Sequence, residues 1–329
     1  MLFIDNQNIT DPTLNLALEE YALKNLPPNT DYLLFYINEP SIIIGKNQNT
    51  AAEINADYVE KNGIHVVRRL SGGGAVYHDL GNLNFSFITN NDGDSFHNYR
   101  KFTEPVVRAL AKLGVEAELT GRNDIQVGER KISGNAQFST KGRMFSHGTL
   151  LFDSEIENVV SALNVNPEKF KSKGIQSIRS RVANISEFLR EPITIASFRQ
   201  QLLESIFEGT QIHTYELTDA DWAAIHELAD RRYRNWEWNY GKSPAFNIRQ
   251  VKRLATGTFD VQLYVVEGKI QQATIFGDFF GQGEVREFAD KLQGVRFDLP
   301  SVKEALNDVD FSYYFGPVTA EEWLGMLFE

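Results

Sequence analysis

The sequence predicts an α+β protein with two domains, for three reasons. Over roughly the first 150 residues, the expected strands and helices are mixed without the regular alternation of a parallel α/β sheet. The chain has 329 residues, and single cores rarely grow beyond about 250–300 residues. The apolar fraction of 42% and the charged fraction of 23% are those of an ordinary globular protein. We expect a large domain with a mixed sheet and helices over residues 1–246 and a small α+β accessory domain over residues 247–329.

The first half begins with a helix and continues with strands. Residues 15–26 carry apolar side chains along one helical stripe, which Pro27 and Pro28 end. Residues 103–114 repeat this pattern and finish at a glycine, a common helix end. The expected strands are the β-rich or alternating runs 33–37, 41–44, 64–67, 83–88 and 147–152, with a hairpin over residues 125–132.

The second half contains two helices followed by a small α+β unit. Residues 195–207 and 219–233 are helical in pattern. Residues 259–265 alternate apolar and polar side chains, and a glycine turn leads to a second strand over residues 270–276, which predicts an amphipathic hairpin. The helices expected after this hairpin cover residues 285–292 and 301–306.

The composition excludes several classes of protein. The chain contains no cysteine, which excludes disulfides, thiolate metal sites and any mechanism through a cysteine nucleophile. Its formal net charge of −11 argues against a nucleic-acid binder held mainly by phosphate contacts. No apolar run approaches the ~20 residues of a membrane-spanning helix, and the first residues lack the pattern of a secretory signal. The sequence therefore predicts a cytoplasmic protein that binds neither nucleic acid nor membrane.

Residues 68–78 are the most informative stretch of the chain and read Arg-Arg-Leu-Ser-Gly-Gly-Gly-Ala-Val-Tyr-His. The three glycines let the backbone adopt positive φ angles and let a ligand approach the main chain closely. Arg68 and Arg69 supply forked cationic donors suited to carboxylate or phosphate. Because expected strands lie on both sides, the stretch is either a ligand cradle or an ordinary glycine-rich hairpin, and these residues alone leave both open.

Several common signatures fail on inspection. The glycine run does not continue as a dinucleotide-binding motif, because Tyr77 occupies the third glycine position. Residues 241–243 resemble the end of a P-loop, but Trp236 stands where its first glycine is required. His226 is followed by Asp230, where a zinc-binding helix needs a second histidine. Interpretations as a P-loop protein or a zinc hydrolase are therefore weak.

Cations and small residues recur in two further segments. Residues 121–124 read Gly-Arg-Asn-Asp before the hairpin, and Lys131 is followed by Ser-Gly-Asn at residues 133–135. A lysine near a strand end is usually solvated, but small residues beside it suit a closely approached phosphate. Residues 171–181 contain four cations and one glycine, which fits either a solvated face or a loop that closes over an anion.

Taken in order, these segments resemble the lipoate–protein ligase A family. The triple glycine alone is shared with related biotin and octanoyl transferases, whereas the ordered set is much more specific. The resemblance covers the whole chain, including the accessory domain. The matching segments are Arg68–Asn82, Gly121–Asp124, Lys131–Gly134, His147–Leu151, Lys173–Arg181, Trp236–Gly241 and Pro244–Phe246.

The resemblance implies a catalytic domain of the biotin-ligase and class II synthetase type, followed by a small mobile domain. It implies that lipoate and ATP are substrates and that lipoyl-adenylate is the intermediate. The lipoyl group would then pass to one lysine of a lipoyl-domain acceptor, either an E2 subunit of a 2-oxoacid dehydrogenase or the glycine-cleavage H protein. Mg²⁺ is the expected cofactor.

The resemblance and the residue chemistry together give roles to single residues. Lys131 is the expected catalytic cation, placed against the lipoyl carboxylate and the α-phosphate. Asp124 is the expected Mg²⁺ ligand, because that ion prefers hard oxygen donors. The expected lipoate-binding residues are Tyr36, Arg69, Ser71, Gly72, Gly73, Gly74, Ala75, His78, His147 and Gly148, and the expected ATP- or adenylate-binding residues are Val76, Tyr77, Asn82, Asn123, Asp124, Lys131, Gly134, Lys173, Gly174, Ile175, Ser180 and Arg181.

Some of these assignments have alternatives. His78 and His147 match family positions near the lipoyl pocket, but either could be a hydrogen-bonded core histidine. Tyr36 stands where some family members carry tryptophan. An acyl transferase between carrier proteins is disfavoured, because related transferases use a cysteine that this chain lacks. A non-catalytic acyl-adenylate-binding protein would keep the glycines and lose the lysine, whereas Lys131 is present. An ATP-dependent ligase is therefore favoured.

Overall fold

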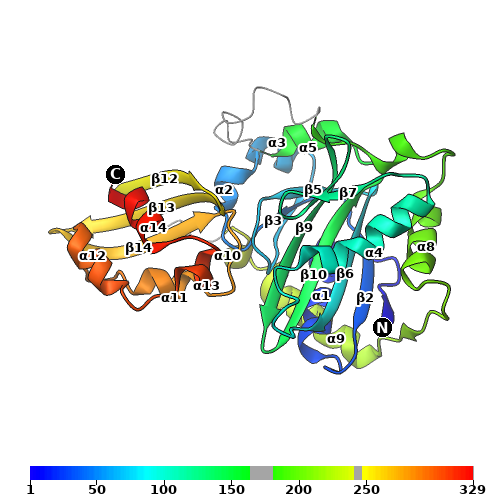
Figure 1. The fold of residues 1–329 in the computed structure, drawn as a ribbon, viewed down its shortest axis with the longest axis horizontal. Helices are drawn as coiled ribbons and strands as arrows, with labels where there is room; N and C mark the ends of the chain where they lie inside the picture. Colours follow the sequence, from blue (N-terminus) through cyan, green and yellow to red (C-terminus); the bar gives the residue numbers. More distant parts are fainter. Residues whose placement is uncertain (164–180, 241–246, 329) are drawn as a thin grey trace. The chain divides into compact units, whose positions relative to one another are not determined.

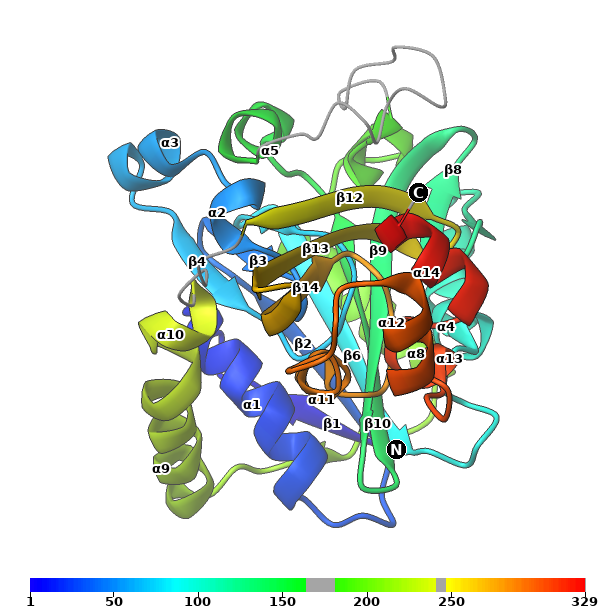
Figure 2. The same ribbon diagram turned by 90° about the vertical axis from the view of Figure 1, so that its left-hand side faces the viewer.

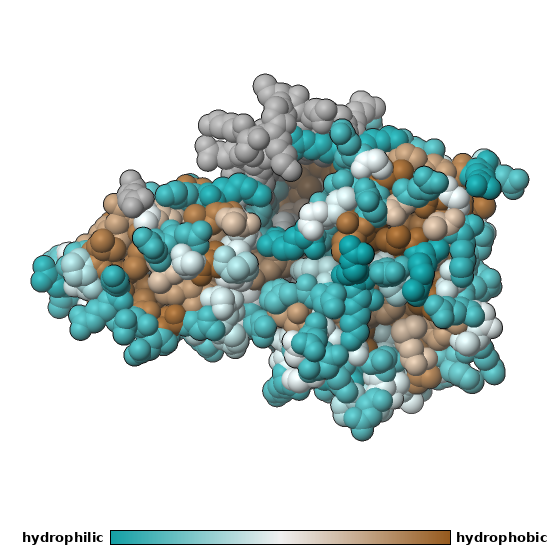
Figure 3. All heavy atoms as spheres, in the orientation of Figure 1, coloured by the Kyte–Doolittle hydropathy of each residue, from teal (hydrophilic) through white to brown (hydrophobic). Residues whose placement is uncertain are grey.

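The computed structural model describes residues 1–163, 181–240 and 247–328. Within these ranges, no helix is long and apolar enough to span a lipid bilayer. The surfaces drawn in Figure 3 are largely hydrophilic, with apolar residues gathered in separate groups.

The chain folds into two compact units, and each is described by itself. Two loops from the first quarter of the sequence cluster with the C-terminal residues rather than with their sequence neighbours. The first unit comprises residues 1–43, 53–67 and 76–239, and the second comprises residues 44–52, 68–75 and 240–329. The expected boundary between residues 246 and 247 stays a prediction, because residues 241–246 lie outside the described ranges.

The first unit is built on an eight-stranded mixed sheet (Figure 1). Its strands are β1 (Leu2–Asp5), β2 (Tyr32–Ile37), β6 (Asn82–Asn90), β7 (Glu118–Thr120), β8 (Asp124–Val127), β9 (Arg130–Thr140), β10 (Arg143–Leu151) and β11 (Thr214–Tyr215). They are arranged in the order β11-β1-β2-β6-β10-β9-β8-β7. The pairs β11–β1 and β1–β2 are parallel, and all later pairs are antiparallel.

Helices lie on both faces of this sheet. α4 (Tyr99–Lys112) and α8 (Ile195–Ile206) pack on one face, and α1 (Pro12–Asn25) lies on the other with α9 (Asp219–Leu228) beside it (Figure 2). α9 continues into one π-helical turn, Ala229–Tyr233. Under α4 and α8 the apolar side chains of alternate strand positions form the main core, which includes Phe85, Phe87, Phe102, Val106, Phe198 and Leu202.

Helix α1 is buried on nearly every side, including its acidic residues. The side chain of Asp11 caps its N-terminus by accepting hydrogen bonds from the amides of Thr13 and Leu14, and Pro12 begins the helix. Glu19 and Glu20 are each only 2% exposed. A buried carboxylate costs free energy unless it is paired, so these two residues must have specific partners.

A second, three-stranded sheet carries the glycine-rich segment. It consists of β3 (Ser41–Ile44), β4 (His65–Arg68) and β5 (Val76–His78), with β3 in the centre. The glycines lie between two strands, as expected, but the strand that follows them is β5, which was not predicted, rather than the expected strand over residues 83–88. The short helices of this region are α2 (Thr50–Glu53), α3 (Ala56–Lys61) and α5 (Ile156–Ala162).

The C-terminal part of the second unit is a small α+β fold. An antiparallel sheet is formed by β12 (Ile248–Leu254), β13 (Gly257–Val266) and β14 (Lys269–Gly277). Its helices are α11 (Val285–Asp290), α12 (Leu299–Ala305), α13 (Phe311–Phe315) and α14 (Ala320–Phe328). The core between sheet and helices is rich in aromatic rings, including Phe259, Phe279, Phe288, Phe315 and Trp323.

The predicted α+β class is confirmed, and most predicted elements have a counterpart. Strand β12 was not predicted, because Arg249, Lys252 and Arg253 interrupt the apolar pattern of an edge strand. The predicted helix over residues 219–233 is present, but its last turn is π-helical. Strands β1 and β11 were also missed, and both are too short for periodicity to identify.

Candidate active site

Several of the expected site residues share one face of the eight-stranded sheet. Across β6 and β10, Asn84 lies opposite Thr149 and Ser86 lies opposite His147. Across β2 and β6, Tyr36 lies opposite Asn84. Directly paired residues project to the same face of a sheet, so these five side chains line a single surface. It is the face opposite the main apolar core, on which α1 lies (Figure 2).

A buried polar stripe runs along β6 on this face. Asn82, Asn84 and Ser86 are each at most 1% exposed. Asn82 Nδ2 donates to Asn84 Oδ1 at 3.0 Å, and Asn84 Nδ2 donates to the carbonyl of Tyr36 at 3.2 Å. Three buried polar residues in mid-sheet are costly to bury, so this face is built for more than packing. Asn84 and Ser86 were missed from the sequence, although polar residues alternating with apolar ones at period two were the signal.

Lys131 and Asp124 meet at the hairpin of β8 and β9. Lys131 Nζ is 2.8 Å from Asp124 Oδ1, and the two side chains are 35% and 33% exposed. Asp124 pairs with Gly134 in the sheet. A Cβ on Gly134 would lie only 3.0 Å from Lys131 Nζ, so the ammonium group lies against main chain that carries no side chain. The structure thus brings three expected site residues together, with the cation still accessible to solvent.

Asn135 and Thr149, which were not singled out from the sequence, help to hold this arrangement. Asn123 Nδ2 donates to the carbonyl of Asn135 at 2.5 Å, and Asn135 Nδ2 donates to the carbonyl of Asn123 at 2.9 Å. The amide of Gly134 donates to Thr149 Oγ1 at 3.1 Å. The side chain of Asn135 therefore fixes the main chain that precedes Asp124. Asn135 and Thr149 both stood inside the quoted motifs, which was the available signal. We call Asp124, Lys131, Gly134 and Thr149 the lysine cluster.

Helix α1, which lies on this face of the sheet, holds the side chain of His147. Its Nδ1 lies 2.9 and 3.1 Å from the two carboxylate oxygens of Glu19. Its ring packs against Phe145 with centroids 4.7 Å apart. This contact gives buried Glu19 the partner that it requires. Glu20 has other partners: Tyr233 in the π-helical turn donates its hydroxyl to Glu20 at 2.7 Å, and Lys24 Nζ and Arg232 Nη1 lie 2.6 and 3.1 Å from Glu20 Oε1.

Gly148, an expected lipoate-binding residue, has a packing role in the sheet. A Cβ there would lie 2.1 Å from Asn135 Oδ1 and 2.6 Å from the ring of Phe85. No side chain larger than hydrogen therefore fits between β9 and β6 at this position. Gly148 allows Asn135 to reach the main chain of Asn123.

The residues of β5 lie in the three-stranded sheet. His78 Nδ1 accepts a hydrogen bond from Asn38 Nδ2 at 3.0 Å, and both side chains are buried. Val76 pairs with Ile43 across the sheet. Burial, assisted by the charge of Asp79, raises the pKa of Tyr77 to about 12. Its hydroxyl is therefore neutral at physiological pH.

The glycine loop, residues 69–75, is organised by its own arginine. Arg69 is 5% exposed. Its Nη2 donates to the carbonyls of Gly72 at 2.6 Å and Gly74 at 2.9 Å, and its Nε donates to Ser71 Oγ at 3.0 Å. Gly73, between the two bonded carbonyls, has a φ of 93° that side chains other than glycine disfavour. Arg69 thus serves first as a scaffold for the loop.

Arg68 performs a similar task on the neighbouring loop of the second unit. It donates to the carbonyls of Gly45 at 2.9 Å and Gln48 at 2.7 Å and to Thr50 Oγ1 at 2.6 Å. Burial lowers the pKa of this guanidinium to about 10, so it remains charged at neutral pH. The sequence suggested the guanidinium groups of Arg68 and Arg69 as donors to a ligand. In the structure, both groups donate to main-chain carbonyls and hold the two loops in shape.

The lysine-rich segment is described only at its end. Lys173, Gly174, Ile175 and Ser180 lie outside the described residues. Arg181 is half-buried, and the next residue, Val182, forms a parallel bridge with Lys131. The amide of Ala183 donates to the carbonyl of Lys131 at 3.0 Å. The chain therefore leaves this segment directly beside the lysine cluster.

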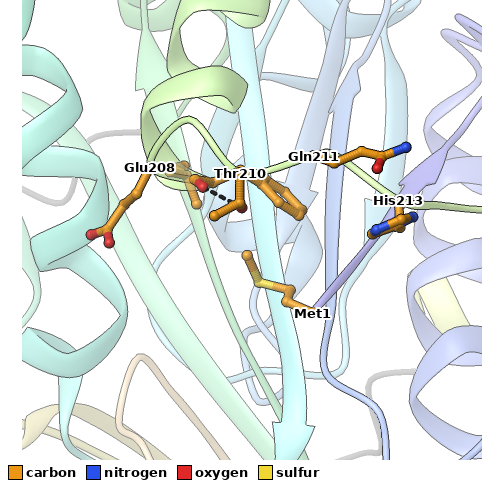
Figure 4. Close-up of a pocket in the computed structure, with 7 residues that line it drawn as sticks. Met1, Glu208, Thr210, Gln211 and His213 are labelled. Carbon is orange, nitrogen blue, oxygen red and sulfur yellow. Dashed lines mark hydrogen bonds between the residues drawn. The ribbon is translucent and has the colours of Figure 1, made fainter.

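A surface pocket elsewhere in the first unit contains none of the expected site residues. It lies between the end of α8 and the start of β1, and Figure 4 shows the side chains that line it. Within it, Thr210 Oγ1 donates to the carbonyl of Phe207 at 2.6 Å. The lining residues are Met1, Ile206, Phe207, Glu208, Thr210, Gln211 and His213. They contain no cluster of cations, so the lysine cluster in the first unit and the glycine loop in the second remain the candidate regions, each considered by itself.

Comparison with known proteins identifies the family of the chain. Residues 11–207 match the family model of the lipoyl protein ligase A/B catalytic domain, and residues 243–327 match that of the bacterial lipoate protein ligase C-terminus. The chain is 60% identical over 331 aligned positions to lipoate-protein ligase LplJ of Bacillus subtilis strain 168, with 100% of both chains covered.

Two solved structures resemble the fold. The P. falciparum protein LipL1 in complex with lipoate has a TM-score of 0.79 at 25% identity, covering 99% of this chain and 97% of that one. A lipoate-protein ligase A bound with ATP has a TM-score of 0.61 at 33% identity, covering 70% of this chain and 94% of that one.

Proposed function

Because this chain belongs to the lipoate–protein ligase family, we propose that it activates lipoate with ATP and then transfers the lipoyl group to a lysine of an acceptor protein. The observation that carries this proposal is the position of Lys131. Its ammonium group is held by Asp124 at 2.8 Å and lies against the main chain of Gly134, yet its side chain is 35% exposed. A fixed, accessible cation beside bare main chain suits a phosphate better than it suits a structural ion pair.

The first step joins two anions, so its main obstacle is electrostatic. A carboxylate oxygen of lipoate attacks the α-phosphorus of ATP, the bond from that phosphorus to the bridging oxygen breaks, and pyrophosphate leaves. Lys131 would neutralise the carboxylate and the α-phosphate together as they approach. Preorganised positive charge is the largest contribution that a protein makes to such a reaction.

Asp124 fits a single-carboxylate Mg²⁺ site. Among the described residues, no group of three or more His, Asp or Glu side chains could hold a metal ion. Mg²⁺ is commonly bound through one or two carboxylates, with phosphate oxygens and water as its other ligands. Asp124 would supply that carboxylate, and the ion would offset charge on the departing pyrophosphate. Asn123 would act indirectly, because its side chain is bonded to main chain.

The glycine loop would hold the acyl end of lipoate. Arg69 holds the carbonyls of Gly72 and Gly74 in place, and amide groups of the glycines would be the main-chain donors to the ligand. Amide donors without a covering Cβ suit a carboxylate or an acyl carbonyl. On the sheet face, His147 and Tyr36 would line the path of the acyl chain.

The second step needs no nucleophile from the enzyme. The amine of the acceptor lysine attacks the acyl carbonyl of lipoyl-AMP, an amide forms and AMP leaves. We propose lipoyl domains of E2 subunits and the glycine-cleavage H protein as acceptors. The cytoplasmic location expected from the sequence stays a prediction.

Mass spectrometry of a purified apo-lipoyl domain tests the function directly. After incubation with the enzyme, ATP, Mg²⁺ and lipoate, we expect one lipoyl group on one lysine, and no modification when ATP is omitted. Modification without ATP, from a lipoylated carrier protein, would instead establish an acyl transferase. No modification under either condition would contradict both enzymatic functions.

A further inference from the structure

We infer that Phe280, far from the glycine loop in sequence, is a positioning residue for that loop. This inference deepens the proposed function and rests on it, because it assumes that the loop binds the acyl substrate. It starts from the observation that residues 68–75 belong to the same compact unit as residues 240–329. The loop is therefore packed against the accessory fold.

The contact between the loop and Phe280 is close. A Cβ built on Gly73 would lie 2.6 Å from Cζ and 2.9 Å from Cε1 of the Phe280 ring. A Cβ on Gly72 would lie 2.5 Å from the carbonyl oxygen of Phe279. The ring of Phe280 therefore lies against the Cα of Gly73 in space that no side chain there could share. With Arg69 bonded to the flanking carbonyls, the loop is held at two points.

Phe280 is itself mounted rigidly. Its neighbour Phe279 stacks on Phe259 with ring centroids 4.6 Å apart and is fully buried. On the other side, a Cβ on Gly281 would lie 1.8 Å from the carbonyl oxygen of Tyr314. The backbone on both sides of Phe280 is therefore fixed by the core of the accessory fold, which leaves the ring little freedom to move away.

A second connection ties the neighbouring loop to the same fold. The amide of Gly277, the last residue of β14, donates to the carbonyl of Asn47 at 2.6 Å. Lys46 Nζ is 2.9 Å from Glu284 Oε1, and the amide of Lys46 donates to the carbonyl of Ser71 at 2.9 Å. The position of the glycine loop is thus set by residues that lie about 200 positions later in the chain. Binding sites need such fixed geometry, because their residues must be held close to the productive arrangement.

Hydrogen exchange and steady-state kinetics on the full-length protein test this role. The variants are Phe280→Ala, the conservative Phe280→Tyr, and Phe297→Ala as a matched control. Phe297 packs on Phe328 at 5.0 Å in the same accessory fold. We expect faster exchange of the amides of residues 69–75 in Phe280→Ala only. We also expect kcat/KM for lipoate to fall roughly tenfold or more, since misplacement by about 1 Å can cost about 100-fold, with the loss mainly in KM. Phe280→Tyr should retain near-normal values of both.

The outcomes separate the inference from the proposed function. Unchanged loop exchange and unchanged KM for lipoate in folded Phe280→Ala would overturn the positioning role, as would an equal effect of Phe297→Ala. A wild-type protein that does not adenylate lipoate would contradict the proposed function, while the exchange result would still report on the loop. If Phe280→Ala does not fold, Phe280→Leu decides, because leucine keeps an apolar side chain but removes the ring atoms that lie against Gly73. Its loop amides should exchange faster than those of the wild type, and unchanged exchange with an unchanged KM for lipoate would overturn the role.

Discussion

The lysine cluster and the glycine loop are held in place by different physical means. The lysine cluster is set by strand register: Asp124 pairs with Gly134 across β8 and β9, and Gly134 is bonded to Thr149 on β10. The glycine loop has no such ladder. Its shape depends on one buried guanidinium, Arg69, and on packing against Phe280.

This difference predicts opposite responses to substitution. In the lysine cluster the side chains are partly exposed and the backbone is fixed by neighbouring strands, so a change should alter chemistry and leave the fold intact. In the glycine loop, Gly72 and Gly73 are closely packed against Phe279 and Phe280, so even a methyl group at these positions should displace the main chain. Comparing activity with stability in both regions tests this view.

The largest effect is expected for Lys131→Met. Removing the cation should slow formation of lipoyl-AMP by about 100-fold or more, in the range known for loss of one preorganised electrostatic contact. The melting temperature should hardly change, because a partly exposed ion pair contributes at most about 1 kcal/mol. Pyrophosphate release and thermal unfolding measure the two quantities.

Lys101→Met is the matched control for that change. Lys101 Nζ lies 3.2 Å from Asp92 Oδ2, another partly exposed lysine–aspartate pair of the first unit. Its loss should leave adenylation unaffected. Equal losses of activity in the two variants would show that Lys131 has no special role.

In the glycine loop we expect Gly72→Ala to combine a loss of activity with a loss of local order. The methyl group would come within 2.5 Å of the carbonyl oxygen of Phe279, which is main chain and cannot turn away. We expect kcat/KM for lipoate to fall roughly tenfold or more and amide exchange of the loop to increase. Gly74→Ala is the control for packing, because nothing lies within 4 Å of its Cβ position, and a similar increase in exchange there would contradict the explanation.

The contrast between the two regions also explains what the sequence could reveal. Lys131, Asp124 and Gly134 were identifiable because a hairpin brings them together within eleven residues, so local motifs and strand pairing were sufficient. The α+β class and the small C-terminal hairpin were predictable for the same reason, since periodicity is a local signal.

The remaining parts depend on contacts that are remote in sequence. Glu19 reaches His147 across 128 positions, and nothing in a helical stripe shows which acidic residue will be buried. The contacts of Arg68 and Arg69 with main chain were also not predictable from sequence alone, because a guanidinium that suits an anion suits a cluster of carbonyls equally well. Only the fold shows that both arginines bind main chain.

A smaller effect is expected for Asp124→Asn, which tests how the charge of the lysine cluster is used. If this carboxylate holds Mg²⁺ during activation, the variant should need several-fold more Mg²⁺ to reach its half-maximal rate, because hard cations bind charged oxygens best. Stability should change by at most about 1 kcal/mol. A titration of Mg²⁺ at saturating ATP gives the first quantity, with Asp92→Asn as the control. An unchanged Mg²⁺ requirement would leave Asp124 only its contact with Lys131.

The smallest effect is expected for Gly134→Ala, which is the counterpart of Gly72→Ala in the other region. Both methyl groups would meet an atom at 3.0 Å or less, and neither glycine has a positive φ. At Gly134, however, that atom is Lys131 Nζ, the end of a flexible side chain, which can shift by a few tenths of an ångström. We expect a change in stability within about 0.5 kcal/mol and a loss of adenylation of only a few-fold. A loss as large as that of Gly72→Ala, with increased exchange along β9, would mean that the main chain of the lysine cluster is as easily displaced as that of the glycine loop, and the distinction between the two regions would fail.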